Sequence, residues 1–398
     1  MDRSSRGQVD AFIVMDMVAA ARALEEQGRS IIHMEVGQPG TMAPTGARAA
    51  VAKAVGSDTL GYTVSRGLPA LRQGIAALYQ RWYDVDLNPE RVIVTSGSSG
   101  AFVLAFTALF DAGARVGMGE PGYPSYRQIL RALSLQPIGI PTSLQNRLQP
   151  TPADLQGVDI NGLIVASPGN PSGTMLSRGA LADLIDHCDQ RGISFVSDEI
   201  YHGLHYDAPA TSALQITDNA YVINSFSKYF SMTGWRIGWM VVPEGHIRTV
   251  ERLAQNLFIC PPHVAQIAAL AALDCDVELQ ANRATYATNR ALMLAGLAAA
   301  GFTRFAPPDG AFYIYADVSD LTDDSYTLAR DILHGAGVAV SPGLDFDPVR
   351  GHQTLRFSYA ASTADIIEGL RRLTAFMINR SRAEPVANPP PHWNNSPQ

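Results

Sequence analysis

Cysteine is scarce in this 398-residue chain, which contains only Cys188, Cys260 and Cys275. Their number is odd, their spacings are wide and no CxxC pair occurs. A disulfide framework or a cysteine-based metal site is therefore not expected. We predict unpaired thiols in a reducing compartment, and no metal.

Long apolar runs are also absent. No stretch of about 18 uncharged apolar residues occurs, so we expect no membrane span. The apolar residues 12–15 are interrupted by Asp16 and no small-residue cleavage pattern follows, which argues against a signal peptide. These absences leave the cytoplasm as the expected location.

Charge is limited, and positive charge is in the minority. Charged residues make up 17% of the chain, and 30 basic against 37 acidic side chains give a net charge of −7. A nucleic-acid surface needs a basic field, so this balance excludes that class of partner and suits a protein that handles small molecules. Hydrophobic residues, at 46%, suffice for a large core, and the length allows two domains.

Apolar segments of strand length alternate with segments of helical periodicity along most of the chain. Strands are expected at 31–36, 91–95, 115–118, 162–166, 194–197, 220–224, 237–242, 310–315, 338–340 and 355–359. Helices are expected at 16–28, 46–56, 69–83, 101–110, 125–135, 178–191, across 244–300 with a break at Pro261 and Pro262, and at 363–380. The alternation predicts an α/β fold with a mostly parallel sheet.

The last part of the chain reads as a smaller α+β unit. We expect a large domain over residues 46–285 and a small C-terminal domain over 286–383. An N-terminal arm over 1–45 is expected to pack with the small domain. Residues 384–398 are rich in proline and asparagine and are expected to form a disordered tail.

Polar and glycine-rich clusters follow the predicted strands, at the edge where ligands bind in open α/β sheets. Residues 225–238 (SFSKYFSMTGWRIG) place Lys228 after a buried strand, among hydroxyls and eight positions before Arg236. A partly buried lysine amine has a lowered pKa and forms Schiff bases with carbonyl cofactors. Hydroxyls and an arginine suit a phosphate. An amine that can react with an aldehyde therefore lies beside groups that can bind a phosphate. Pyridoxal phosphate carries both an aldehyde and a phosphate, so it is the predicted cofactor.

Six segments carry a family resemblance. They are 167–174 (SPGNPSGT), 197–201 (SDEIY), 225–228 (SFSK), 232–238 (MTGWRIG), 310–313 (GAFY) and 355–358 (LRFS). Together, over roughly residues 10–380, they resemble the fold-type I pyridoxal-phosphate enzymes, specifically the class I/II aminotransferases of the aspartate aminotransferase superfamily. The resemblance implies a three-layer large domain with a mostly parallel sheet, of the aspartate aminotransferase-like PLP-transferase fold, beside a smaller α+β domain.

The resemblance also assigns catalytic roles. Lys228 would hold the cofactor as an internal aldimine and then, once freed, move the proton between the substrate Cα and the cofactor C4′. Asp198 would pair with the pyridine nitrogen and keep it protonated, which makes the ring an electron sink. Tyr201 and Asn170 would hydrogen-bond the phenolic oxygen of the cofactor, and Asn170 would also touch the substrate carboxylate.

The phosphate contacts follow from the same resemblance. Ser225, Ser227 and Arg236 resemble the phosphate ligands of the family. The turn that contains Ser98 and Ser99 would add backbone N–H groups at a helix N-terminus, which is a ready anion site.

Four further residues resemble members of the family's site. Tyr123 would stack on the pyridine ring. Arg356 would bind the substrate α-carboxylate, which its guanidinium fork matches bidentately, and Gly37 would lie where the chain closes over that carboxylate. Tyr62 resembles the tyrosine that reaches the phosphate of the neighbouring subunit, which implies a homodimer with shared active sites.

The implied reaction moves an amino group from an L-amino acid to a 2-oxo acid. Residues 12–14, the expected lid, and residues 257–260 are apolar, so we expect a neutral or aromatic donor, with 2-oxoglutarate or pyruvate as acceptor. Acidic substrates need a second cation for the distal carboxylate. Arg66 is the candidate, with a solvated loop arginine as the alternative.

Two other functions stay open at this point. A pyridoxal-phosphate-dependent carbon–sulfur β-lyase or an aminocyclopropane-carboxylate synthase-like enzyme would keep the same lysine, aspartate and arginines, so the motifs do not separate them from an aminotransferase. A regulator built on this fold would need a DNA-binding domain ahead of it. The short segment before Gly37 and the acidic chain argue against that function.

Overall fold

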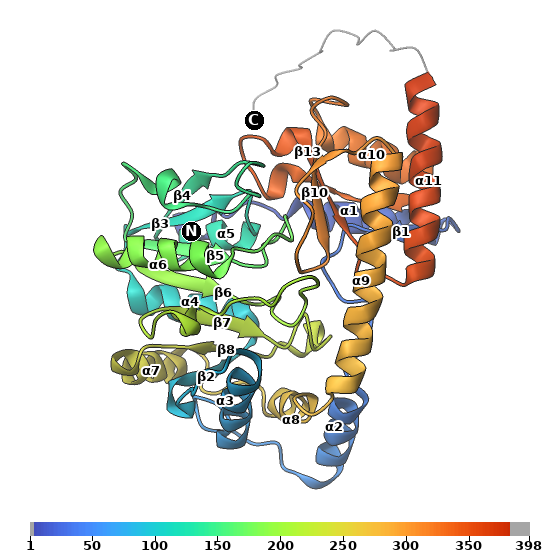
Figure 1. The fold of residues 1–398 in the computed structure, drawn as a ribbon. Helices are drawn as coiled ribbons and strands as arrows, with labels where there is room; N and C mark the ends of the chain where they lie inside the picture. The colour runs from blue at the N-terminus through green and yellow to red at the C-terminus, as the bar shows by residue number, and fades with distance from the viewer. Residues whose placement is uncertain (1–3, 383–398) are drawn as a thin grey trace.

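A seven-stranded sheet forms the centre of the computed structural model, which describes residues 4–382 (Figure 1). The strand order is β2-β8-β7-β6-β5-β3-β4, and β8 runs antiparallel to both neighbours while the other pairs are parallel. The strands are β2 (Val92–Thr95), β3 (Arg115–Glu120), β4 (Gln136–Pro141), β5 (Gly162–Ala166), β6 (Ser194–Asp198), β7 (Tyr221–Ser225) and β8 (Gly238–Val241). The α/β prediction with a mostly parallel sheet is confirmed.

Both faces of this sheet are buried under helices. Successive side chains on a strand point to opposite faces, so one strand can contribute to both apolar clusters. In β5, Leu163 and Val165 join one apolar cluster and Ile164 joins the other. The cluster that contains Ile164 is covered by α4 (Gly97–Leu109), α5 (Pro124–Ala132) and α7 (Ile247–Leu257). The opposite cluster includes side chains of α3 (Pro69–Tyr83), α6 (Arg178–Gln190) and α8 (His263–Ala272), with α2 (Thr45–Ser57) packed on α8.

A second, antiparallel sheet lies beside the first (Figure 1). Its order is β12-β13-β10-β9, with β9 (Arg304–Phe305), β10 (Tyr313–Asp317), β12 (Ser341–Pro342) and β13 (Thr354–Ser358). The helices of this region are α10 (Ser325–Ala336) and α11 (Thr363–Arg382), and α9 (Asp276–Ala299) packs along α11.

The N-terminal segment pairs with this C-terminal region. Strand β1 (Ile32–His33) runs parallel to β11 (Val338–Ala339), and α1 (Ile13–Glu26) contacts β11 and β12. The domain boundary expected near residue 285 falls inside α9, so the division into domains stays a prediction. The tail expected over residues 384–398 lies outside the described residues.

Several elements differ from expectation. Strand β4 was not expected, because Pro137 and Pro141 are typical strand breakers, and the edge position explains why they are tolerated. Helix α10 was also not expected, although the Asp324 side chain caps it by accepting from Tyr326 N and Thr327 N. Helix α4 begins four residues earlier than expected, at Gly97, which brings the Ser98 and Ser99 turn into the helix N-terminus.

All three cysteines are free thiols. Within residues 4–382, no helix combines the length and apolar character needed to cross a membrane.

Candidate active site

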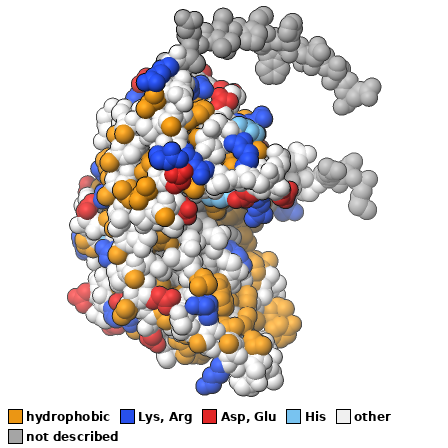
Figure 2. Space-filling model, turned by 90° about the vertical axis from the view of Figure 1, so that its right-hand side faces the viewer, with side chains coloured by type: hydrophobic (Ala, Val, Ile, Leu, Met, Phe, Trp, Pro, Cys, Tyr) orange, Lys and Arg blue, Asp and Glu red, His pale blue; other side chains and the backbone are white. Residues whose placement is uncertain are grey.

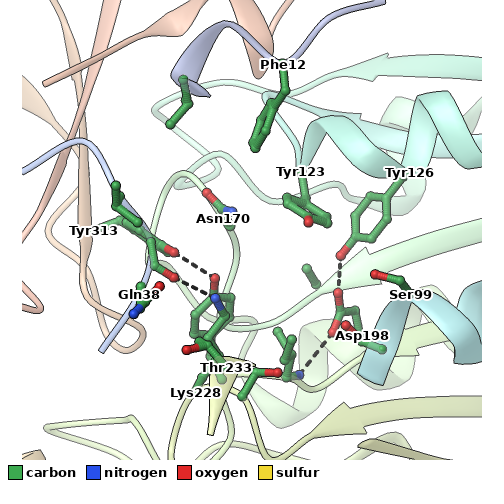
Figure 3. Close-up of a pocket in the computed structure, with 18 of the residues that line it drawn as sticks. Phe12, Gln38, Ser99, Tyr123, Tyr126, Asn170, Asp198, Lys228, Thr233 and Tyr313 are labelled. Atoms are coloured by element: carbon green, nitrogen blue, oxygen red, sulfur yellow. Dashed lines mark hydrogen bonds between the residues drawn. The ribbon is translucent and has the colours of Figure 1, made fainter. Parts of the chain in front are cut away.

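One cavity of about 710 Å³ lies at the carboxyl ends of the central strands. Because β5, β6 and β7 are parallel, the loops that follow them meet at one edge of the sheet. Most of the residues predicted for the site line this cavity: Gly37, Ser98, Ser99, Tyr123, Asn170, Asp198, Tyr201, Ser227, Lys228, Arg236 and Arg356. Figure 3 shows several of these side chains around the cavity.

Lys228 follows β7, and its side chain points into the cavity (Figure 3). Its Nζ donates to Gly37 O at 2.6 Å. Burial lowers the pKa of this amine to about 8, and the positive charges of Arg356 and Arg236 act in the same direction. A lysine with such a pKa has a useful fraction of neutral amine near physiological pH, which a carbonyl-capturing lysine requires.

Asp198 ends β6 and is buried. Its carboxylate accepts from Tyr126 OH and, at 3.0 Å, from Ile200 N. Burial raises the pKa of Asp198 to about 6, although the two donors act against that rise. A buried carboxylate that faces a cavity is costly unless a cation joins it, and a protonated pyridine nitrogen is such a cation.

Arg356 lies on β13 and is only 3% exposed. Its Nη1 donates to Asn170 Oδ1 at 3.0 Å and its Nη2 donates to Glu35 O at 2.5 Å, while Nε has no partner. The guanidinium lies between the rings of Tyr313 and Phe346, at 4.5 and 4.6 Å from their centroids. None of the ion pairs within residues 4–382 involves Arg356. A buried guanidinium without a carboxylate partner fits an anionic ligand.

A cradle that suits an anion such as phosphate lies where α4 begins. Ser98 and Ser99 occupy the first turn of α4, where backbone N–H groups point outward and the helix dipole favours an anion. A Cβ on Gly97 would lie 2.3 Å from Nη2 of Arg236, so glycine allows this guanidinium to approach the helix end. Arg236 is itself exposed, and its Nη1 donates to Thr233 O at 3.0 Å.

Two of the predicted cofactor residues do not line the cavity. Ser225 is buried behind it, and its Oγ lies 2.8 Å from the Oγ of Ser227, which does line the cavity. Tyr62 is 85% exposed and lines a separate hollow with Cys260 and His263. One chain therefore does not bring Tyr62 to the other residues of the site.

The predicted lid lies at the cavity, whereas the predicted second cation lies outside it. Phe12 and Val14 line the cavity, whereas residues 257–260 do not. Arg66 lies outside the cavity, where it pairs with Glu90 at 2.7 Å and with Glu251 at 3.4 Å.

Sequence reasoning missed several residues of the cavity, above all Tyr126 and Tyr313. Tyr126 donates to Asp198, and its ring lies 5.3 Å from that of Tyr123, three residues earlier. That i, i+3 spacing at the start of a helix was the available signal. Tyr313 OH lies 2.9 Å from Tyr201 OH, and a Cβ on Gly37 would lie 2.0 Å from that Tyr313 oxygen. The other lining residues without a predicted role include Met15, Val36, Gln38, Ile200 and Thr233.

These residues fit pyridoxal phosphate as a group. An amine with a lowered pKa suits the aldehyde, the helix N-terminus with Arg236 and Ser227 suits the phosphate, and buried Asp198 suits the ring nitrogen. The unpaired charge of Arg356 leaves a place for a substrate carboxylate on the same cavity wall.

The chain is similar to known proteins over nearly its whole length. The model of the family "Aminotransferase class I and II" matches residues 29–373. A valine–pyruvate aminotransferase from Mycobacterium tuberculosis is 47% identical over 378 residues, which are 94% of this chain and 97% of the relative. A (5-formylfuran-3-yl)methyl phosphate transaminase from Methanocaldococcus jannaschii is 32% identical over 92% of this chain and 97% of its own length.

The fold is also similar to solved structures over nearly the whole chain. The crystal structure of an aminotransferase from Mycobacterium tuberculosis superposes with a TM-score of 0.93 at 46% identity, covering 95% of this chain and 100% of the other. That of a protein from Silicibacter pomeroyi gives a TM-score of 0.92 at 66% identity, with 96% and 100% coverage. The similarity to named aminotransferases does not favour the β-lyase or aminocyclopropane-carboxylate synthase-like alternative.

Proposed function

The chain belongs to the aminotransferase class I and II family and is a pyridoxal-phosphate-dependent transaminase, and from this premise we propose its substrates and the roles of its residues. The donor is a neutral L-amino acid, with an aliphatic side chain such as that of valine favoured. The acceptor is pyruvate in preference to 2-oxoglutarate. The similarity to the valine–pyruvate aminotransferase from Mycobacterium tuberculosis supports this pair of substrates.

The charge balance of the cavity carries the substrate proposal. Among the described lining residues, the cationic side chains are Lys228, Arg236 and Arg356. Lys228 is needed at the reacting carbon, Arg236 at the phosphate and Arg356 at the α-carboxylate. A distal carboxylate of aspartate or 2-oxoglutarate would enter without a cation, which is costly in a partly desolvated site. The lining also has an apolar part, which is formed by Phe12, Val14, Met15 and Val36.

The chain's own residues divide the chemical work. When bound, pyridoxal phosphate supplies an aldehyde that captures amines and a protonated ring that withdraws electrons from the substrate Cα. Lys228 Nζ would take the proton from the substrate Cα and deliver it to the cofactor C4′, because its lowered pKa leaves the amine able to accept a proton. Asp198 holds the proton on the ring nitrogen. Arg356, beside Asn170, binds the substrate α-carboxylate and fixes the Cα next to Lys228.

The remaining proposed contacts hold the cofactor. Ser98, Ser99, Ser227 and Arg236 bind the phosphate, and buried Ser225 orients Ser227. Tyr123 packs on the ring, and Tyr201 hydrogen-bonds its phenolic oxygen, as Asn170 also does. Gly37 keeps space for Tyr313 beside the substrate carboxylate.

A homodimer is also part of the proposal. Tyr62 of a second copy would complete the phosphate site, because Tyr62 is exposed and lies outside the cavity of its own chain. We place the enzyme in the cytoplasm, where its three free thiols would stay reduced.

The substrate proposal is tested by kcat/KM with pyruvate for valine, alanine, methionine, phenylalanine and aspartate. We expect valine to exceed aspartate by about 100-fold, because aspartate would bury an unpaired charge. The acceptors are compared with valine as donor. A preference for aspartate, or for 2-oxoglutarate over pyruvate, would overturn the proposal.

The role of Lys228 has an independent test, because the chain contains two lysines, Lys53 and Lys228. Borohydride reduction of the holoenzyme followed by peptide mass spectrometry is expected to place the cofactor on Lys228. The variant Lys228→Ala should lose both the adduct and activity, whereas Lys53→Ala, which alters an exposed helix position, should keep both.

A further inference from the structure

Helix α1 forms one wall of the cavity through its first residues, and this end of the helix lacks a cap of its own. Phe12, Val14 and Met15 line the cavity. Figure 3 shows Phe12 on the N-terminal segment, across the cavity from Lys228. The N-cap position of α1 is Phe12, whose side chain cannot accept a hydrogen bond. The first N–H groups of the helix therefore need an acceptor from elsewhere in the fold.

Asp345 supplies that acceptor. Its Oδ1 accepts from Ile13 N at 2.9 Å and its Oδ2 accepts from Val14 N at 2.8 Å. Asp345 ends a short 3-10 helix (Gly343–Asp345) and is only 7% exposed. A carboxylate at a helix N-terminus is stabilised by two charge-assisted hydrogen bonds and by the helix dipole. The contact joins residues that lie 332 and 331 positions apart in the sequence.

The residue after Asp345 connects this contact to the rest of the site. Phe346 packs with Val14 and Tyr315 in a small apolar cluster, against which Phe12 also packs. The Phe346 ring lies 4.6 Å from the Arg356 guanidinium. Its carbonyl oxygen accepts from Gly122 N at 2.9 Å, next to Tyr123. The segment at 345–346 therefore ties the start of α1 to the carboxylate-binding arginine and to the turn that carries Tyr123.

We propose that Asp345 is a positioning residue for substrate selection: it fixes the start of α1 so that Phe12, Val14 and Met15 form a firm apolar wall for the donor side chain. This inference rests on the proposed function, in which that wall meets the donor. Without the carboxylate, the first turn of α1 has unsatisfied N–H groups and opens more readily. A loose wall loses contact with a branched side chain, whereas the methyl group of alanine depends on it less.

The first test measures the wall directly, without reference to activity. Hydrogen exchange followed by mass spectrometry is compared for the holoenzymes of wild type, Asp345→Asn and Asp16→Asn. We expect Asp345→Asn to accelerate exchange at the amides of residues 13–15 by about tenfold or more, with core peptides unchanged. Asp16→Asn removes the same charge from the exposed first turn of α1 and should have little effect. Equal exchange in wild type and Asp345→Asn would overturn the proposal that Asp345 fixes the start of α1.

The second test measures selectivity. In Asp345→Asn, kcat/KM for valine should fall by about tenfold and that for alanine by less than about threefold, mostly through KM, because the lost contact is made in the ground state as well. Phe12→Ala shortens the wall itself and should show the same pattern. An equal loss for valine and alanine in Asp345→Asn overturns the role in selection.

The two tests separate the possible failures. If wild type prefers aspartate, the proposed function fails, and exchange at residues 13–15 still decides whether Asp345 holds α1. If Asp345→Asn does not yield folded protein, Asp345→Ser removes the carboxylate with a smaller side chain, and the same two measurements apply to it.

Discussion

At the scale of single residues, burial brings the pKa values of Asp198 and Lys228 closer together. Burial raises the pKa of Asp198 to about 6 and lowers that of Lys228 to about 8. Burial disfavours the charged form of each group, so the donors around Asp198 are needed to keep it ionised at neutral pH. The chief donor is Tyr126 OH, supplied by α5.

Removal of that donor gives a first prediction. In Tyr126→Phe, the pKa of Asp198 should rise further, because the ionised carboxylate loses a hydrogen bond. A carboxyl group with a raised pKa is less ionised at neutral pH, so kcat should fall by about tenfold near pH 7 and recover as the pH increases. The measurement is kcat against pH for the donor substrate.

A matched control comes from β7. Tyr221→Phe removes a buried hydroxyl that lies 2.7 Å from His246 Nδ1, away from the cavity. It should leave the pH profile of the wild type unchanged. The assignment of Tyr126 is wrong if the profiles of Tyr126→Phe and Tyr221→Phe coincide.

The amine of Lys228 gives a second prediction. Acetylation of Lys228 in the apoenzyme should rise about tenfold per pH unit below its pKa and level off above about pH 8, since only the neutral amine reacts. An unstructured lysine peptide, with its ordinary pKa near 10.4, should keep rising beyond that point. Trace labelling followed by peptide mass spectrometry measures both.

The cause of the shift can be tested on the same apoenzyme. Arg356→Met removes one of the positive charges that lower the pKa of Lys228, so the midpoint should move to higher pH. A midpoint for wild-type Lys228 close to that of the peptide would contradict the burial argument.

At the scale of elements, the N-terminus of α4 is the part of the proposed phosphate cradle that depends on backbone shape. Gly97 has φ +71°, a conformation that L side chains rarely adopt, and a Cβ there would meet the Arg236 guanidinium. The helix end and the arginine approach each other closely only because this position has no side chain.

The third prediction concerns this position. Gly97→Ala should weaken pyridoxal phosphate binding by about tenfold or more and lower the melting temperature, because both Arg236 and the helix end must shift. Gly179→Ala is the control, since nothing lies within 4 Å of the added Cβ in α6. It should leave binding unchanged and stability equal or slightly higher. Cofactor titration and thermal unfolding of both variants measure the difference, and equal behaviour would count against the cradle.

At the scale of the whole molecule, an exposed apolar surface accompanies the exposed Tyr62. Val64, Leu257, Phe258 and Ile259 are 55, 52, 37 and 54% exposed. The segment around Tyr62 touches the segment 257–263. His263 Nδ1 lies 3.1 Å from Gly61 O, and Thr63 N donates to Cys260 Sγ. Hydrophobic side chains gather on the lower part of the face in Figure 2, the end at which α2 and α8 lie in Figure 1. Such a surface fits the proposed homodimer.

The fourth prediction tests shared active sites. Sedimentation should give about twice the chain mass of 42.7 kDa. Tyr62→Ala should weaken cofactor binding, and Lys228→Ala should be inactive. Mixed dimers of these two variants should recover one normal site per dimer, because an intact Lys228 then meets an intact Tyr62 from the other copy.

The mixing experiment has a clear control. The two variants are first measured separately and then after joint unfolding and refolding. Cofactor affinity that stays at the level of Tyr62→Ala after mixing would show that Tyr62 does not act across an interface.

The local sequence determined a large part of this protein. Strands such as 162–166 and the helix 69–83 were predictable, because apolar periodicity and capping act over a few residues. Lys228, Asp198 and Asn170 were found because they lie at the ends of parallel strands, which meet at one edge of the sheet. Arg356, on antiparallel β13, was found through the family resemblance of residues 355–358. Strand β4 was missed because it contains two prolines, whereas helix α10 was overlooked although Leu328, Ile332 and Leu333 have helical spacing.

Tertiary structure alone decided the contacts between distant segments. Tyr126 meets Asp198 across 72 residues, Arg356 meets Asn170 across 186, and Asp345 holds α1 across more than 330. Ser225 lies behind Ser227 and Tyr62 lies outside the cavity of its own chain, although their motifs resemble those of cofactor ligands. The physical reason is that local periodicity specifies an element and its buried face. The partner of a polar side chain at the end of an element is set by how the whole chain packs.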